Sequence, residues 1–121
     1  MKIVTDLSKI SKDENPVVAL GNFDGLHLGH QEVIKTAVKA AKESGKKSAV
    51  LTFDPNPRRF FKPEGFYEIC DKNLKYRIIE EMGVDYLYEI HFDENFASIS
   101  PKEFVDLILV DKINTSHLVT G

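Results

Sequence analysis

The chain has 121 residues, of which 42% are hydrophobic and 29% are charged, and its formal net charge at pH 7 is −3. This balance is typical of one globular domain and excludes a largely disordered chain, and the acidic charge argues against a general nucleic-acid-binding protein. A single cysteine, Cys70, excludes an internal disulfide and a thiolate metal cluster, and the lack of any long apolar run predicts a cytoplasmic protein with neither a membrane segment nor a signal peptide.

The first clear structural unit is a strand, a turn and a helix. Residues 2–4 are compatible with either a short edge strand or an irregular lead-in. The apolar run Val17–Leu20 predicts a buried parallel strand, which ends at Gly21. An amphipathic run over about Leu28–Ser44 predicts the helix that follows. In an open parallel sheet such a unit binds phosphate, because the helix N-terminus presents free N–H groups and a partial positive charge.

Two histidines lie at this predicted phosphate site. His27 and His30 are three positions apart, so a first helical turn places both imidazoles on one face. Gly29 lies between them and, having no side chain, lets a ligand approach the backbone. The pattern is neither a P-loop nor the Gly-x-Gly-x-x-Gly dinucleotide fingerprint. Three roles stay open on this evidence: phosphate binding, a zinc site with Asp24 as a third ligand, and histidines that are purely structural.

The rest of the chain alternates between strands and helices. Three more apolar runs predict strands, at Ser48–Phe53, Tyr86–Phe92 and His117–Val119. Two more helices are predicted, one from the cap Asp71 to about Met82 and one from a capping box that begins at Ser100. In the second helix four apolar side chains are expected to face the core: Phe104, Val105, Ile108 and Leu109. This alternation predicts a doubly wound, Rossmann-like α/β fold with a mainly parallel sheet.

A stiff loop is predicted where the strand Ser48–Phe53 ends. Its residues are Asp54, Pro55, Asn56, Pro57 and Arg58. The two prolines fix their own φ angles and restrict the residues before them. Because the loop follows the carboxyl end of its strand, it is expected at the same sheet edge as the histidines. Arginine can pair with phosphate and nearby aromatic rings can stack on a planar ligand, which favours a binding loop over a plain turn.

The turn after the first strand resembles a known signature. It reads Gly21-Asn22-Phe23-Asp24-Gly25-Leu26-His27-Leu28-Gly29-His30. This is similar to the Gly-x-Phe-Asp-Gly-x-His-x-Gly-His form found in nucleotidylyltransferases, in particular in the FMN adenylyltransferase module of prokaryotic bifunctional riboflavin kinase/FMN adenylyltransferases. The segment 52–57 resembles the flavin-side loop of that family, and Lys75 matches a lysine in the helix that follows. Cys70 departs from the family, which commonly has threonine there.

The resemblance implies transfer of AMP from ATP to FMN, which gives FAD and pyrophosphate, with Mg²⁺ bound to the phosphates and few or no protein ligands. It implies that His27 and His30 contact the ATP phosphates. It places the nucleotide against Gly21, Asn22, Phe23, Asp24 and Gly29. It places the flavin side at Asp54, Pro55, Asn56, Pro57 and Arg58. The implied partners are small-molecule substrates (ATP, and FMN or riboflavin), with no nucleic acid and no membrane.

Two other functions remain open for the same residues. One is a related transferase that uses another phosphate acceptor, and the other is a non-catalytic nucleotide- or flavin-binding module. The family's Ser/Thr-x-x-Arg motif and its riboflavin kinase domain do not occur in residues 1–121. We therefore expect these residues to be the N-terminal part of an adenylyltransferase domain within a longer, bifunctional polypeptide.

Overall fold

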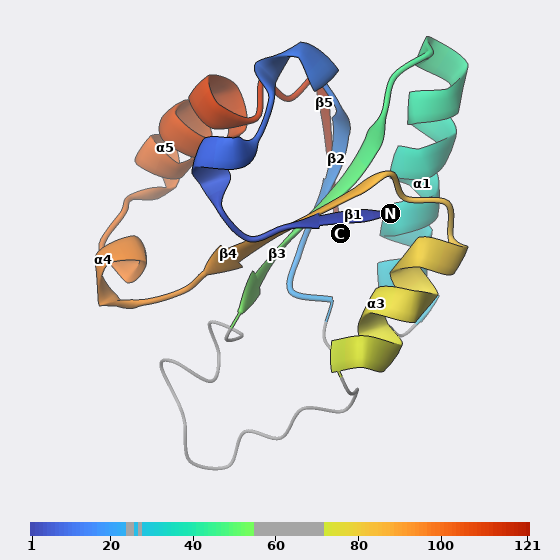
Figure 1. Cartoon of the computed structure of the whole chain (residues 1–121), viewed down its shortest axis with the longest axis horizontal. Coiled ribbons are helices and arrows are strands. Elements are labelled where there is room, and N and C mark those ends of the chain that lie inside the picture. The colour runs from blue at the N-terminus through green and yellow to red at the C-terminus, as the bar shows by residue number, and fades with distance from the viewer. Residues whose placement is uncertain (24–25, 27, 55–71) are drawn as a thin grey trace.

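One parallel sheet forms the centre of the computed structural model, which describes residues 1–23, 26, 28–54 and 72–121. Its order is β1-β4-β3-β2-β5 (Figure 1). The strands are β1 (Lys2–Val4), β2 (Val17–Leu20), β3 (Ser48–Asp54), β4 (Tyr86–His91) and β5 (His117–Thr120). All four neighbouring pairs run parallel. The predicted Rossmann-like, mainly parallel α/β fold is confirmed, and residues 2–4 form an edge strand.

Helices cover both faces of the sheet. On one face lie α1 (Leu28–Ser44) and α3 (Lys72–Glu81), and on the other lie α4 (Glu94–Ala97), α5 (Pro101–Glu103) and a π-helix over Phe104–Lys112 (Figure 1). Coverage on both sides explains why the central strands are continuous apolar runs instead of alternating ones. No helix in the described part of the chain is long and apolar enough to span a bilayer.

The pleat of β2 divides the core into two layers. Val17 and Ala19 point to one face, where they pack with Ile34 and other buried residues of α1. Val18 points to the opposite face and packs with Ile108 of the π-helix. Each of these β2 side chains is fully buried, which is the expected result of period-two alternation in a strand covered on both sides. Because β2 is packed on both faces, the point where it ends and the point where α1 begins are held in place by the core.

The last helix differs from the sequence prediction. The capping box at Ser100 and the proline at the first helical position are confirmed, but after one turn the winding becomes π. The N–H of Ile113 accordingly donates to the carbonyl of Ile108, five residues back, at 3.0 Å. Wider turns bring Ile108 and Leu109 inward but leave Val105 45% exposed. The expectation that Val105 faces the core was therefore wrong, because it assumed the α-helical repeat.

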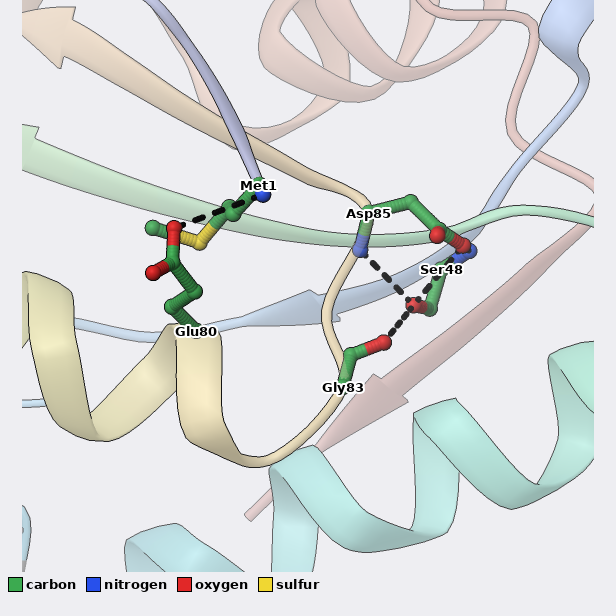
Figure 2. Close-up of polar contacts among 5 residues, drawn as sticks. All are labelled: Met1, Ser48, Glu80, Gly83 and Asp85. Carbon is green, nitrogen blue, oxygen red and sulfur yellow. Dashed lines mark hydrogen bonds and ion pairs between the residues drawn. The ribbon is translucent and has the colours of Figure 1, made fainter.

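A cluster of polar groups joins the amino ends of β3 and β4 (Figure 2). The carboxylate of Asp85 accepts a hydrogen bond from the buried N–H of Ser48 at 2.9 Å, and the Ser48 hydroxyl lies 3.4 Å from the carbonyl oxygen of Gly83. Beside this cluster the α-amino group of Met1 lies 3.4 Å from a carboxylate oxygen of Glu80 (Figure 2). These bonds satisfy backbone groups that the parallel ladder leaves free at the strand ends.

Replacing Asp85 by alanine is expected to lower the free energy of unfolding by about 1–3 kcal/mol, because it leaves the buried N–H of Ser48 without its acceptor. Urea denaturation followed by circular dichroism measures the change. The exposed Asp106 of the π-helix supplies the control, and Asp106→Ala is expected to change the free energy by less than about 0.5 kcal/mol. Equal denaturation midpoints for the two variants would contradict this role of Asp85.

Candidate functional site

The candidate site lies where β2 ends and the chain turns into α1. The sheet ladder continues one residue past the strand, since the N–H of Gly21 donates to the carbonyl of Leu51 at 3.2 Å. The chain then leaves the sheet through Asn22 and Phe23. At the start of α1 the side-chain amide of Gln31 donates to the carbonyl of Leu26 at 2.9 Å, which ties the turn to the helix.

Two side chains from other elements hold the backbone of the turn. The carbonyl oxygen of Asn22 accepts a hydrogen bond from the Thr52 hydroxyl of β3 at 3.1 Å and one from Nζ of Lys75 on α3 at 2.7 Å. The Oδ1 atom of Asn22 is buried, with no hydrogen-bond partner among the residues that the structure describes. Buried acceptors without a partner are uncommon in native proteins, and a functional role is one of the reasons for which they persist.

The turn contains two strained backbone positions. Phe23 has a φ of +51° and Leu26 a φ of +43°, both in the left-handed region that side chains with a Cβ disfavour. Each such residue costs on the order of 1 kcal/mol or more, and the strain persists only where the surrounding contacts impose it. Here burial imposes it, because Phe23 is 2% exposed and Leu26 is 3% exposed. Strain of this kind concentrates at ligand sites.

Phe23 connects the turn to His30. A Cβ built on Gly21 would lie 3.0 Å from Cζ of the Phe23 ring, so the ring lies directly over the glycine. The same ring meets the imidazole of His30 edge to face, with the ring centroids 5.6 Å apart and the planes at 88°. A side chain at position 21 therefore fits only if the buried ring of Phe23 shifts, and the packed ring restricts where His30 can lie.

His30 is half-buried in the first turn of α1, next to the exposed Gly29. That first turn contains no acidic side chain, so nothing within it neutralises the positive end of the helix dipole. The Nδ1 atom of His30 is buried. The described part of the turn thus places the N-terminus of α1 and the His30 side chain at the carboxyl edge of the sheet.

Several predicted site residues lie outside the part of the chain that the structure describes. They are Asp24 and His27, and Pro55, Asn56, Pro57 and Arg58 of the segment predicted to form a loop after β3. The predicted helix cap Asp71 and the residue Cys70 lie outside it as well. Of the flavin-side residues only Asp54 is described. The expected proximity of the loop to the two histidines therefore remains a prediction.

Asp54 belongs to a charged network that the sequence prediction missed. Nζ of Lys72, at the start of α3, lies 2.8 Å from a carboxylate oxygen of Asp54 and 3.2 Å from one of Glu89. The Tyr76 hydroxyl donates to the other carboxylate oxygen of Glu89 at 2.5 Å. Hydrogen bonding to Asp54, and then to Glu89, raises the pKa of Lys72 above its ordinary value. The sequence signal for this network was Glu89, a single acidic residue inside the apolar run of β4.

Phe53 anchors the end of β3 on the opposite face of the sheet from α3. Its ring lies 5.9 Å from that of Phe92, 5.8 Å from Phe96 and 6.2 Å from Phe104, measured between centroids. Aromatic contacts of this kind hold a strand end in place through packing on several sides. The aromatic cluster around Phe53 and the salt bridge from Lys72 to Asp54 together hold the carboxyl end of β3 in place.

Tyr76 gives the network a measurable pH dependence. Burial, and then the hydrogen bond to Glu89, raises the pKa of Tyr76 from 10 to about 12. The folded protein therefore holds the phenol proton more tightly than the unfolded chain, so this contribution to stability is complete below pH 10 and is lost as the pH rises towards 12.

Replacing Tyr76 by phenylalanine is expected to lower the free energy of unfolding by about 1.5–3 kcal/mol at neutral pH, because the buried Glu89 loses a donor. The difference between the wild-type protein and the variant is expected to shrink between pH 10 and about 12. Urea denaturation across this range measures it, and Tyr86 and Tyr88, whose pKa values are also raised, are common to both proteins. A difference that stays constant over the range would contradict the account.

The described residues include no group of three or more His, Cys, Asp or Glu side chains placed to hold a metal ion. Asp54, the last residue of β3, forms a salt bridge with Lys72. His27 and Asp24, which a zinc site at the turn would need, lie outside this part of the chain. Zinc binding by these residues therefore stays an open alternative.

A five-stranded parallel sheet that carries a strained strand–turn–helix unit at its carboxyl edge places the chain among the doubly wound α/β proteins, whose ligands bind at that edge. Within this class, the family model described as FAD synthetase matches residues 9–121. The chain belongs to the FAD synthetase family.

Known relatives agree with this assignment. The chain is 43% identical over 109 residues to the bifunctional riboflavin kinase/FMN adenylyltransferase of Bacillus subtilis, covering 87% of this chain and 34% of that protein. It is 40% identical to the Listeria monocytogenes protein of the same name, covering 90% of this chain and 35% of that protein. The chain thus spans about a third of the length of these relatives.

A solved structure described as a macrolide-efflux protein from Streptococcus pneumoniae has the same fold. It superposes with a TM-score of 0.84 and 31% sequence identity, covering 98% of this chain and 46% of the other.

Proposed function

We propose that this chain carries the adenylyl-transfer site of an FMN adenylyltransferase, which joins the AMP moiety of ATP to FMN and releases pyrophosphate. The observation that carries the proposal is the strained turn between β2 and α1 in a chain of the FAD synthetase family. The names of the relatives include both FMN adenylyltransferase and riboflavin kinase. Because the chain spans about a third of their length, the kinase activity is proposed only for a longer polypeptide.

The proposed reaction needs no nucleophile from the protein. An oxygen of the FMN phosphate attacks the α-phosphorus of ATP, the bond from that phosphorus to the bridging oxygen breaks, and pyrophosphate leaves with the electron pair. The protein's task is to hold the two substrates in line and to stabilise negative charge as it moves onto the leaving group. A helix N-terminus with no acid in its first turn suits that task.

Different residues of the turn are proposed to bind the ATP phosphates and to hold the rest of the nucleotide. His30 donates through Nε2 to the ATP phosphates, and His27, on the resemblance of its motif, does the same. The backbone from Gly21 to Asp24 and the open surface at Gly29 hold the nucleotide. The packing of Phe23 between Gly21 and His30 supports this assignment, because it fixes the imidazole before the ligand arrives.

The flavin is proposed to bind beside the loop that follows β3. Asp54 ends β3, and the remaining residues proposed for the flavin side are Pro55, Asn56, Pro57 and Arg58. The support is that Asp54 lies at the carboxyl end of a strand adjacent to β2, with its carboxylate held by Lys72. FMN bound there would present its phosphate towards the turn between β2 and α1.

Mg²⁺ is proposed to arrive with ATP, bound by the phosphates. The described residues offer no cluster of carboxylates that would hold the ion by themselves, and Mg²⁺ in such sites commonly relies on phosphate oxygens and water. No step of the proposed reaction is assigned to a metal ligand of the protein. The proposed partners are small molecules, and the proposed location is the cytoplasm, where these nucleotides occur.

Product analysis tests the proposal. The natural polypeptide that carries this chain is incubated with ATP and Mg²⁺, with FMN in one reaction and riboflavin in another, and the flavins are separated by chromatography. FAD formed from FMN is the expected result. Tight binding of ATP without FAD would instead support a non-catalytic binding module, and activity with a different phosphate acceptor would support a related transferase.

A further inference from the structure

We infer that Lys75 is a positioning residue of the adenylyl-transfer site, which acts by holding the carbonyl of Asn22 and, through Phe23, the imidazole of His30. This inference rests on the proposed function and goes beyond the residues assigned to it above. Its basis is a contact between two elements that lie far apart in the chain. Nζ of Lys75 on α3 donates to the carbonyl oxygen of Asn22, 53 residues away, at 2.7 Å.

The contact of Lys75 differs in kind from that of the neighbouring lysine. Lys72, one turn earlier on the same helix, reaches two carboxylates at the end of β3 and in β4. Lys75 is half-buried and reaches a backbone carbonyl that also accepts a hydrogen bond from Thr52. The two donors come from α3 and β3, so the carbonyl is held by two elements other than the strand and helix that the turn connects. A carbonyl held in this way cannot rotate freely.

The bond lies at the point where the turn begins to be strained. Asn22 directly precedes Phe23, whose φ of +51° depends on restraint by surrounding contacts. Holding the Asn22 carbonyl fixes the peptide plane that leads into Phe23. The ring of Phe23 in turn packs over Gly21 and against the imidazole of His30, 5.6 Å away between centroids. Lys75 therefore acts on the position of His30 indirectly, through the carbonyl of Asn22 and the ring of Phe23.

The charge of Lys75 adds a second effect at the same place. Its ammonium group lies 2.7 Å from the backbone of the turn that leads into the N-terminus of α1, where the reaction brings the phosphates of ATP. A cation near this end of the helix strengthens the attraction for an anion, and a neutral side chain of equal length would lose it. Both effects predict that Lys75 matters for the rate of transfer more than for the stability of the fold.

The test compares Lys75→Met with Lys75→Arg in the natural polypeptide that carries this chain. Methionine preserves the apolar stem but removes the charge and the donors, and it is expected to lower kcat for FAD formation by about tenfold to a hundredfold, with KM for FMN changed less than about threefold. Arginine preserves a cation that can donate to the carbonyl and is expected to restore kcat to within about threefold. Lys39→Met, at an exposed position of α1, is the control and is expected to match the wild-type rate.

Thermal melting and ATP binding are measured on the same samples. A fall in kcat with a melting temperature close to that of the Lys39→Met control supports the inference. If Lys75→Met does not fold, Thr52→Val removes the other donor to the same carbonyl and is expected to lower kcat in the same way, by a smaller factor.

The outcomes separate this inference from the proposed function. A wild-type protein that makes FAD, with Lys75→Met at the same kcat, overturns the role of Lys75 and leaves the proposed function standing. A loss of activity that follows the melting temperature alone, with no recovery in Lys75→Arg, also overturns it. A wild-type protein that binds ATP but makes no FAD overturns the proposed function and the inference together.

Discussion

Replacing His30 by glutamine is expected to lower the rate of FAD formation by about 100- to 1000-fold, the usual consequence of removing one preorganised donor to developing negative charge. His30 lies in the first turn of α1 and its ring is fixed by Phe23, 5.6 Å away between centroids. Glutamine can still donate a hydrogen bond, but its flexible amide has no ring for Phe23 to hold. The rate at saturating ATP and FMN is the quantity to measure.

A second histidine supplies the control for this substitution. His117 begins β5, whose amino end lies at the edge of the sheet away from the turn, and its ring is exposed. His117→Gln is therefore expected to keep the wild-type rate. If His30→Gln also kept it while remaining folded, His30 would have a structural role only, and the site would have to be placed elsewhere.

Replacing Gly21 by alanine is expected to impair both stability and activity. The added Cβ would lie 3.0 Å from the ring of the buried Phe23, and overpacking of a tight site typically costs about 1–3 kcal/mol. Because the same ring contacts His30, its displacement moves the imidazole. We expect a rate loss of at least about tenfold, and urea denaturation and FAD formation measure the two effects separately.

Gly45 allows the two effects to be separated. It ends α1 with a φ of +67°, and a Cβ added there would have no atom within 4 Å. Gly45→Ala is expected to cost about 1–2 kcal/mol through the left-handed backbone alone and to leave the rate of FAD formation unchanged. Equal rate losses in the two glycine variants would show that activity follows stability, and would contradict the specific role of Gly21.

Local chemistry made most of the fold predictable. The apolar runs around β2 and β3 have the composition of strands buried on both faces, and the expected helix from Leu28 to Ser44 agrees with the structure. Gly45 and the capping box at Ser100 signal the end of one helix and the start of another through preferences that act within a few residues. Such features need no knowledge of distant contacts.

What the sequence could not provide depends on contacts between distant segments. Lys75 and Asn22 meet only because α3 packs beside the end of β2, and Lys72, Asp54 and Glu89 gather from three elements in the same way. The π winding over Phe104–Lys112 also escaped prediction, since apolar spacing alone suggested an α-helix. The turn itself was identified by its motif, but the strain at Phe23 emerged only from the structure.

The fate of the phosphorus atoms of ATP distinguishes adenylyl transfer from the other possible reactions. The natural polypeptide that carries this chain is given FMN and Mg²⁺ with ATP labelled either at the α-phosphorus or at the γ-phosphorus. Adenylyl transfer places the α-label in FAD and the γ-label in pyrophosphate, and both signals are expected to form about 100- to 1000-fold more slowly in His30→Gln. A γ-label found in a flavin product without α-label in FAD, or no label transferred to FMN from either position, would contradict adenylyl transfer at the turn between β2 and α1.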